Sequence, residues 1–517
     1  MAVHSSEPRE ATGGRRYRPG VVLAFVCLGQ FMVFIDVSIV NLALPSIQHG
    51  LHMANIDLNY IVTAYATVLG GFLLLAGRLA DSFGRRRMLQ AGLTVFALAS
   101  LVSGLAHNSA TLITARGFQG LGSALIATSA LSILTSTFAE GPERNKALGI
   151  WGSLTGLASI LGVIVGGLLA GGPGWRWIFY INVPIGLCAA ALALWVVPES
   201  MAEKRSRRFD FAGTITVTAG LLLLIFTLGQ ATTVGWNTAR TIGSLAGVGA
   251  LLIAFLVIES LVKDPMVPLR IFRLRTMRVA NLSAVLVFGT FAAMFFFFSL
   301  FMQQAYGYSP TRAGFAYVPL AVCVAVGAGV ASGMITKVAA RPVLIVGLAM
   351  TVGGLLLLAR APSNGTYAAD LLPAFLIVGL GCGACYVTLQ IAAFVGITGE
   401  EAGLGAGLIN TSQEAGSAIG LAIGSTIAYS GLAAKLAAAH GSQTLIRAAQ
   451  ASATPRAFVF AACYCVAAVL LAVFMMPRGK APQAATVGEV QAATAGLAGE
   501  EATSPDLAVA YEENPAM

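Results

Sequence analysis

The sequence predicts an all-α polytopic membrane protein. Three observations predict this class: 57% of the 517 residues are hydrophobic, only 10% are charged, and apolar runs of about 20 residues, enough to cross a bilayer as a helix, recur along the chain. A soluble protein carries about 25% charged residues, and one or two anchors would not lower the average so far. The spans must be helices, because a backbone surrounded by lipid has to satisfy its own hydrogen bonds.

Hydropathy places fourteen candidate spans in the chain. The segment before the first span is polar and rich in arginine, and the apolar run after it is too long for a signal peptide, so we expect that run to remain as a span. In order, the spans cover residues 21–44, 58–77, 88–106, 111–138, 146–171, 177–197, 211–230, 241–261, 279–304, 314–337, 342–360, 370–397, 402–434 and 456–476.

The net charge of +9 does not indicate a nucleic-acid partner, because the basic residues lie in short segments between apolar runs. Most arginines and lysines fall in alternate segments, such as 85–87 and 204–208. Because basic residues favour the cytoplasmic side, we expect both termini in the cytoplasm and the chain in the cell membrane. The 7 cysteines lie inside apolar runs, where a thiol packs as a small apolar group, and no metal site is expected.

Asp36 is the only charged residue between Val21 and Leu44. A charged carboxylate near the centre of a bilayer costs about 2.5–3.5 kcal/mol, and ionisable groups retained there are functional by default. We therefore expect Asp36 to bind a proton or a cation. The alternative is a structural carboxyl that is protonated or paired with a neighbouring hydroxyl or amide.

A second intramembrane acid, Glu414, lies in span 402–434. Asn410, Glu414 and Ser417 are spaced to share one helical face, and Glu414 lies about 18 Å from the cytoplasmic start of the span. We expect this carboxylate to attract a cationic substrate or to bind a second proton. The alternative is a protonated carboxyl that forms a hydrogen bond between helices.

The segment Gly77–Leu89, placed here as a loop after the second span, has a faint echo in Gly333–Ile345. Gly77 aligns with Gly333 and Arg85 with Arg341, at an offset of 256 residues. Repeated halves are found in secondary transporters. Two halves of six spans with two extra spans between them would account for fourteen.

Three motifs give the chain a resemblance to a known family. GRLADSFGRRR at 77–87 resembles the loop signature of the major facilitator superfamily, and WRWIFYINVPIG at 175–186 and FIDVSIVNLALP at 34–45 are similar to segments of its fourteen-span drug:proton antiporters. The resemblance covers Arg18 to Met476. It implies the major facilitator fold, with two six-helix bundles plus two extra linker helices.

The resemblance implies a domain organisation. We expect the following parts: a cytoplasmic N-terminal segment at 1–20, an N-terminal six-helix bundle at 21–200, two linker helices at 201–278, a C-terminal six-helix bundle at 279–476, and a disordered cytoplasmic tail at 477–517 that has too little apolar surface to fold.

The resemblance also implies roles for particular residues. In the first motif, Gly77, Asp81, Gly84, Arg85 and Arg86 are expected to latch the two halves and gate their exchange between conformations. Anchoring by the positive-inside rule is the alternative for the arginines, but it would explain neither Asp81 nor Gly84.

Arg116 and Gln119 lie one turn apart on span 111–138, and the resemblance associates such a pair with proton transfer. An unpaired buried guanidinium is costly, so we expect a carboxylate partner, for which Asp36 is the candidate. The alternative is that Arg116 extends to the outer interface. Asp36, Arg116 and Glu414 are thus the predicted proton-coupling residues.

Small residues recur every fourth position in span 146–171 and allow close helix packing. Gly162, Gly166 and Gly167 match the glycine-rich motif of the family's exporters, although Val163 replaces the usual proline. The substrate cavity is expected to include a set of polar side chains from several spans: Asn41, Gln119, Gln304, Asn410 and Glu414.

The sequence therefore predicts a proton-coupled antiporter, not an enzyme, that exports amphiphilic drugs or antibiotics, hydrophobic or cationic, by alternating access. Because no phosphate-binding G-x-x-x-x-G-K-[ST] motif occurs, no cofactor is expected and the proton gradient is the energy source. The expected partners are a small-molecule drug or antibiotic, protons and membrane lipid, with no nucleic acid and a monomeric chain. One alternative is a dedicated exporter of one native secondary metabolite. A remote alternative is a receptor or membrane enzyme, for which the chain lacks a signalling domain or a catalytic constellation.

Overall fold

The computed structural model describes residues 18–53, 55–200, 210–262, 265–304, 306–362, 365–395, 397, 401–429 and 454–477. Most of the predicted N-terminal segment, the predicted tail and the loop before the last span lie outside these ranges. The described elements are helical: α1 Pro19–Leu51, α2 Asn55–Phe83, α3 Arg85–Leu105, α4 Ser109–Thr137, α5 Pro142–Gly171, α6 Trp177–Tyr180, α7 Asn182–Val196, α8 Phe211–Val234, α9 Ala239–Leu261, η1 Leu269–Arg273, α10 Arg275–Gln304, α11 Pro310–Ala316, α12 Val318–Val338, α13 Ala340–Ala359, η2 Tyr367–Leu371, α14 Leu372–Ala393, α15 Ala402–Tyr429 and α18 Thr454–Met475.

Twelve helical segments in the described ranges are long and apolar enough to cross a membrane. Two more long helices, α5 with 30 residues and α15 with 28, are not among the twelve. Polar side chains such as Gln413 and Glu414 lower the hydropathy of α15. The predicted count of fourteen spans is therefore not confirmed.

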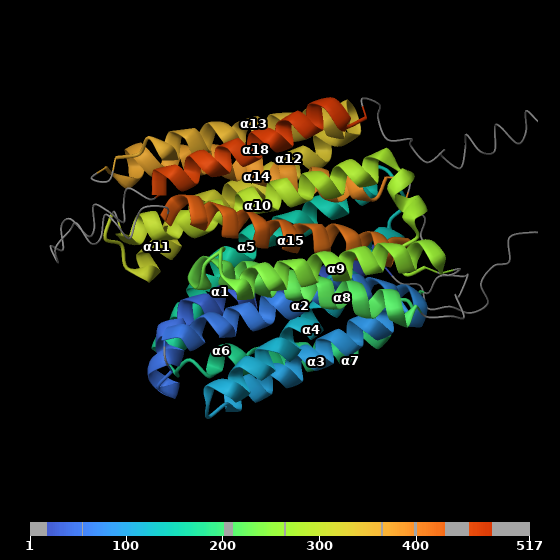
Figure 1. The fold of residues 1–517 in the computed structure, drawn as a ribbon, viewed down its shortest axis with the longest axis horizontal. Helices are drawn as coiled ribbons and strands as arrows, with labels where there is room; N and C mark the ends of the chain where they lie inside the picture. The colour runs from blue at the N-terminus through green and yellow to red at the C-terminus, as the bar shows by residue number, and fades with distance from the viewer. Residues whose placement is uncertain are drawn as a thin grey trace, which may run out of the picture.

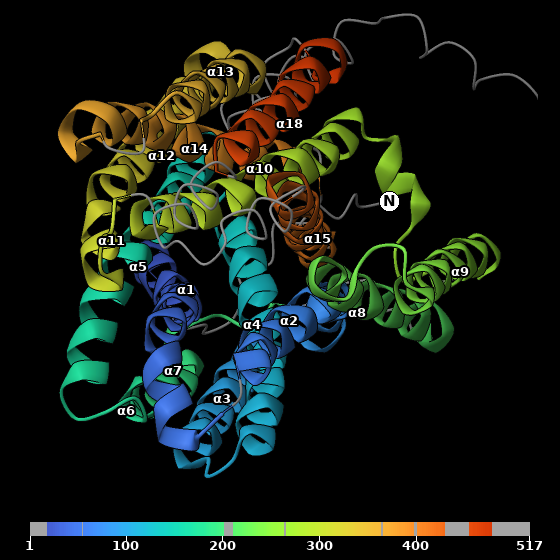
Figure 2. The ribbon, with the colours of Figure 1, turned by 60° about the vertical axis from the view of Figure 1, so that its left-hand side comes forward.

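The long helices run side by side along one axis (Figure 1). In one group α4 packs against α2 and α3, and α1 packs against α5; in the other, α14 packs against α12 and α13, and α10 against α15 and α18. The two groups meet through α2 with α15 and through α5 with α12, which lie side by side in Figure 2. These two seams bring residues far apart in the sequence together.

The helices α8 and α9 form a hairpin outside the two groups (Figure 2). In this hairpin α8 contacts both α2 and α15, and the Trp236 Nε1–H donates a hydrogen bond to Thr426 Oγ1 of α15 over 2.7 Å. The hairpin therefore covers the α2–α15 seam.

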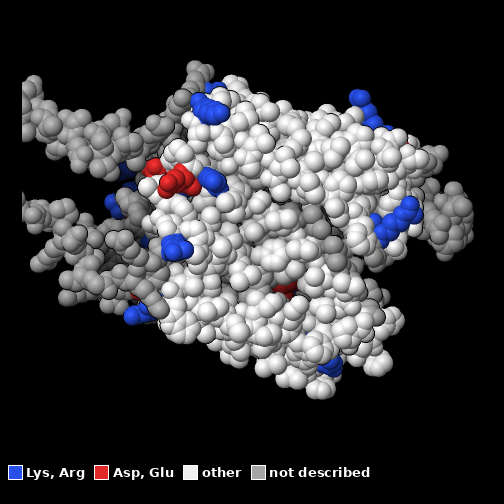
Figure 3. Space-filling model, turned by 180° about the vertical axis from the view of Figure 1, so that it is seen from behind, with Lys and Arg blue, Asp and Glu red and all other residues white. Residues whose placement is uncertain are grey.

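The distribution of charge agrees with a membrane-embedded body. On the face seen in Figure 3, Lys and Arg lie towards the two ends of the long axis, and the band between them is uncharged except for an acidic side chain visible within a recess. An uncharged band of this kind suits the hydrocarbon core of a bilayer.

The predicted loop at Gly77–Leu89 is wrong in its extent. Helix α2 continues through Gly77 and Asp81 to Phe83, and α3 begins at Arg85. Only Gly84 interrupts the helices, with φ 105°, a conformation that disfavours residues with a Cβ atom. The charged residues extend the helices because, as shown below, they find partners at this end of the molecule.

Candidate functional site

A buried ion pair lies within the first helix group. Arg116 Nη1 on α4 donates a hydrogen bond of 2.6 Å to Asp36 Oδ2 on α1, and both side chains are buried, at 2% and 0% exposure. The pairing predicted between these two residues is thus present.

Two amides complete the surroundings of the Asp36 carboxylate. Asn182 Nδ2 of α7 and Gln119 Nε2 of α4 donate to Asp36 Oδ1 over 3.0 and 3.3 Å. Gln119 Oε1 in turn accepts from Arg116 Nη1 at 2.9 Å. Breaking such a buried pair by removing one partner costs about 3–5 kcal/mol, because the other charge is left uncompensated.

The guanidinium of Arg116 has further contacts on its other side. It lies 4.2 Å from the centre of the Tyr65 ring on α2, and its Nε–H donates to the Ile61 carbonyl at 3.5 Å. Gln119 Nε2 also donates to Ser100 Oγ at 2.6 Å. The pair is therefore embedded in a polar network that joins α1, α2, α3, α4 and α7.

Asn182 is a member of this network that the sequence did not single out. It belongs to the motif at 175–186, another residue of which contacts the C-terminal end of α3. Arg176 Nη1 donates to the carbonyls of Gly104 and Ala106 at the end of α3, both at 2.7 Å. The motif thus fixes the end of α3 and holds an amide against Asp36, and its polar asparagine in an apolar run was the available signal.

A cavity of about 590 Å³ lies between the two helix groups, a size typical of small-molecule sites. Its wall is formed by α1, α2, α4, α5, α10, α12, α14 and α15, and most of the lining side chains are apolar or aromatic. They include Trp151, Phe288, Phe291, Phe295, Tyr317 and Tyr386. The sequence did not predict which phenylalanines of α10 face inward.

The polar part of the cavity wall comes mainly from α15. Asn410, Glu414 and Ser417, predicted to share one face, all line the cavity. Glu414 is the carboxylate on this wall, and it lies at the α2–α15 seam, where its Cβ is 3.3 Å from the position a Cβ would take on Gly70. Gln30 and Gln413 add amides that the sequence did not single out.

The other residues predicted for the cavity have different outcomes. Gln119 is fully buried and is not among the lining residues of this cavity, because its amide donates to Asp36 and Ser100 instead. Asn41 and Gln304 lie in helices, but their side chains are outside the described part of the structure. Asp36 itself is buried, while its neighbours Val37 and Ser38 line the cavity.

The residues of the motif at 77–87 join the two helix groups at one end of the bundle. Asp81 on α2 forms an ion pair with Arg85 at 3.0 Å. The same carboxylate accepts backbone N–H groups of Gly403 and Leu404 at 3.0 and 2.9 Å. Asp81 therefore caps the N-terminus of α15 from the opposite group, where a negative charge is favourable.

Gly77 makes this contact possible. A Cβ atom on Gly77 would lie 2.4 Å from the carbonyl oxygen of Gly403, so α2 and α15 could not approach so closely with any larger residue. Arg86 instead contacts its own group: its backbone N–H donates to Glu199 Oε1 at 3.2 Å, and its Nε lies 3.4 Å from Glu199 Oε2.

A second contact crosses between the groups at the same end. Arg144, near the start of α5, donates from Nη2 to the Phe394 carbonyl at the end of α14 over 3.2 Å. Its guanidinium carbon lies 5.3 Å from the centre of the Phe394 ring. A cation suits a helix C-terminus. We call the contacts of Asp81 and Arg144 with the opposite group the latch, and this end of the molecule the latch end.

The glycine motif of α5 packs against α1 beside the ion pair. A Cβ on Gly162 would lie 2.4 Å from Ser38 Cβ, and Gly166 is also buried. Gly167 lies in α5, but its side-chain surroundings are outside the described part of the structure. The predicted close packing is present at Gly162.

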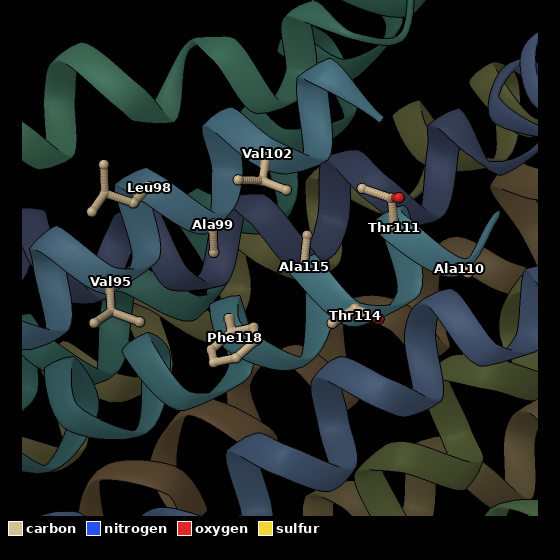
Figure 4. A pocket seen from close by; sticks show the side chains of 9 residues that line it. All are labelled: Val95, Leu98, Ala99, Val102, Ala110, Thr111, Thr114, Ala115 and Phe118. Carbon is tan, nitrogen blue, oxygen red and sulfur yellow. The ribbon is translucent and has the colours of Figure 1, made fainter. Parts of the chain in front are cut away.

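A second pocket, of about 610 Å³, lies between α3 and α4 (Figure 4). None of its described lining residues is charged, and Leu98, Val102 and Phe118 are exposed, so its chemistry suits lipid chains more than a specific ligand. Its lining consists of Val95, Leu98, Ala99, Val102, Ala110, Thr111, Thr114, Ala115 and Phe118.

Comparisons with known proteins bear on what this arrangement does. Residues 26–421 match the sequence profile of the Major Facilitator Superfamily. The chain belongs to the Major Facilitator Superfamily. It is therefore an integral membrane protein of a transporter family, and not an enzyme.

Relatives of this superfamily member are antibiotic and multidrug resistance exporters. It is 33% identical to the puromycin resistance protein pur8 of Streptomyces alboniger over 87% of this chain and 89% of that protein. It is 35% identical to the cephamycin export protein CmcT of Amycolatopsis lactamdurans, covering 81% and 87% of the two chains. The multidrug resistance protein Stp of Mycobacterium tuberculosis is 33% identical, covering 79% and 76%.

A solved structure confirms the major facilitator fold. The crystal structure of the human organic anion transporter MFSD10 (TETRAN) superposes with a TM-score of 0.63 over 88% of this chain and 100% of that one, at 14% identity. At this identity the likeness concerns the fold alone.

Proposed function

We propose that this chain exports amphiphilic drugs or antibiotics, hydrophobic or cationic, across the cytoplasmic membrane in exchange for protons. The observation that carries the proposal is the cavity between the two helix groups, with aromatic walls and, among its described lining residues, one carboxylate, Glu414. Aromatic faces and a buried negative charge suit an apolar cation. The names of the relatives support the same class of substrate.

The fourteen predicted spans are part of this proposal. The lengths of α5 and α15, and their positions between spans of both groups, support their crossing the bilayer as well. The two groups then form two six-helix bundles, with α8 and α9 as linkers. The distribution of basic residues supports a cytoplasmic location for the latch end and both termini.

With this orientation, the structure corresponds to a state closed to the cytoplasm. The latch joins the two bundles at the cytoplasmic end, and the cavity lies beyond it, from Asn410 towards Phe295 and Tyr317. Alternating access then requires the latch to separate. Such an exchange needs two states that differ by only a few kcal/mol.

Asp36 is the proposed proton site. A proton on Asp36 would remove the charge that pairs with Arg116 and would weaken the bonds from Asn182 and Gln119. Because α1 carries both Asp36 and the cavity residues Val37 and Ser38, a change in the network reaches the cavity wall directly. Glu414 would attract a cationic substrate on the opposite wall or bind a second proton.

The proposal is tested by expressing the chain in a host that lacks its own efflux pumps. A panel of cationic, neutral and anionic toxic compounds is scored for resistance, with a protonophore added in parallel. We expect resistance to several amphiphilic compounds that the protonophore abolishes. Resistance to none of them would contradict the proposal.

The range of compounds that the protein exports distinguishes two versions of the function. The relatives named for single antibiotics, such as the cephamycin export protein and the tetracenomycin C resistance and export protein, favour a dedicated exporter of one secondary metabolite as the second candidate. Resistance confined to one structural class of compound would support this second version.

A further inference from the structure

Gln390 on α14 is a buried amide that the proposed mechanism does not use. Its side chain is 0% exposed, and neither its nitrogen nor its oxygen has a hydrogen-bond partner among the described residues. A buried polar group without a partner costs about 1–3 kcal/mol, and a leucine of similar volume would avoid that cost. The amide therefore calls for an explanation beyond the closed structure.

The position of Gln390 along α14 gives the explanation. Residues spaced by four share a helical face, and Cys382 and Tyr386 of this face line the cavity. Gln390 comes next, one turn closer to the latch end, followed by Phe394, which contacts Arg144. Gln390 therefore lies between the cavity and the latch.

Helix α5 faces this stretch of α14. Trp151 of α5 lines the cavity, and a Cβ on Gly152 would lie 2.5 Å from Val387 Cγ2 and 3.1 Å from Tyr386 Cδ1. One layer of contact between α5 and α14 thus lies on the cavity side of Gln390. The Arg144–Phe394 contact forms another layer on the latch side. When the latch separates, the space between these layers opens first to the cytoplasm.

We propose that Gln390 is a substrate-contacting residue of the cytoplasmic half of the transport path. In the closed state its amide has no partner among the described residues, and in the cytoplasm-open state it is exposed and forms hydrogen bonds with a carbonyl, hydroxyl or amide of the entering compound. This inference rests on the proposed export function. It differs from that function in naming a site outside the cavity seen in the closed state.

The first test measures access to position 390. Gln390→Cys is made in an active variant without the 7 native cysteines, and a membrane-impermeant maleimide is applied to inside-out vesicles. We expect labelling that increases when Arg144→Ala weakens the latch. Leu389→Cys is the matched control, because Leu389 is equally buried but on another face of α14, and it should stay unlabelled. Absence of labelling at 390 in the Arg144→Ala background would overturn the proposal.

The second test measures transport. Gln390→Leu removes an amide that has no partner in the described part of the closed structure, so the melting temperature should be unchanged or higher. The substrate is puromycin or ethidium, whichever the wild type exports. For Gln390→Leu, the KM should rise about five- to tenfold, which corresponds to the loss of one hydrogen bond. Gln390→Asn should restore part of the lost affinity. Unchanged KM and kcat for Gln390→Leu would overturn the inference while wild-type export stands. Failure of the wild type to export any compound of the resistance panel would instead contradict the proposed function.

Discussion

Replacing Asp81 with asparagine should loosen the latch without changing the size of the side chain. The carboxylate accepts the Gly403 and Leu404 N–H groups at 3.0 and 2.9 Å, and hydrogen bonds to a charged group contribute about 1.5–3 kcal/mol each. Asparagine keeps one neutral carbonyl acceptor. We therefore expect the closed state to lose about 2–3 kcal/mol, which shifts the equilibrium roughly 30- to 150-fold towards the state open at the latch end.

Distances between spin labels can measure this shift in the purified protein. Phe83 and Phe474 are exposed residues at the latch end, one from each helix group, and Leu105 and Phe315 are exposed residues at the opposite end. In Asp81→Asn the 83–474 distances should lengthen, and the 105–315 distances should shorten.

A matched control separates the latch from general effects of charge removal. Glu199 pairs with Arg86 and Arg87 within one helix group, so Glu199→Gln should leave both distance distributions as in the wild type. If Asp81→Asn also leaves them unchanged, the contact between Asp81 and α15 does not hold the groups together and the reasoning is refuted.

Three further changes test other parts of the site. Asn182→Leu removes a donor 3.0 Å from the Asp36 carboxylate and should lower the stability of the fold by about 1.5–3 kcal/mol, seen as a lower melting temperature. An unchanged melting temperature would show that Asn182 is dispensable. Gly162→Leu places carbon atoms where Ser38 lies and should lower stability by about 1–3 kcal/mol through overpacking, with weaker resistance in cells. Full stability and full resistance would refute the close packing of α1 against α5. Phe291→Ala removes an aromatic side chain from the cavity wall and should raise the KM for apolar dyes about tenfold or more, because about 1.5–3 kcal/mol of apolar burial is lost. An unchanged KM in dye-efflux assays would show that the substrate binds elsewhere.

The sequence predicted the features that depend on composition and on the cost of burying charge. Each predicted span overlaps one or two helices in the described ranges, and the Asp36–Arg116 pair followed from the need of a buried guanidinium for a carboxylate. The family resemblance added the expected contact between halves, for which Asp81 now has named partners on α15.

The remaining features depend on which helices are neighbours, and hydropathy carries no such information. Asn182 reaches Asp36 only because α7 packs beside α1, and Gln119 could not be separated from cavity residues because its burial depends on α3. The phenylalanines of α10 are apolar on every face, so periodicity could not show that Phe291 and Phe295 face the cavity. The sequence did not predict that α2 continues beyond Gly77, because charged residues in this segment are typical of a loop unless their partners are known.

Proton coupling through Asp36 can be measured by transport in proteoliposomes. Wild-type protein and Asp36→Asn are reconstituted with an imposed pH gradient, and transport of a compound from the resistance panel is followed together with the pH inside the vesicles. We expect uphill accumulation with matching proton movement for the wild type, and neither for Asp36→Asn. Uphill accumulation by Asp36→Asn at the wild-type rate would contradict this expectation.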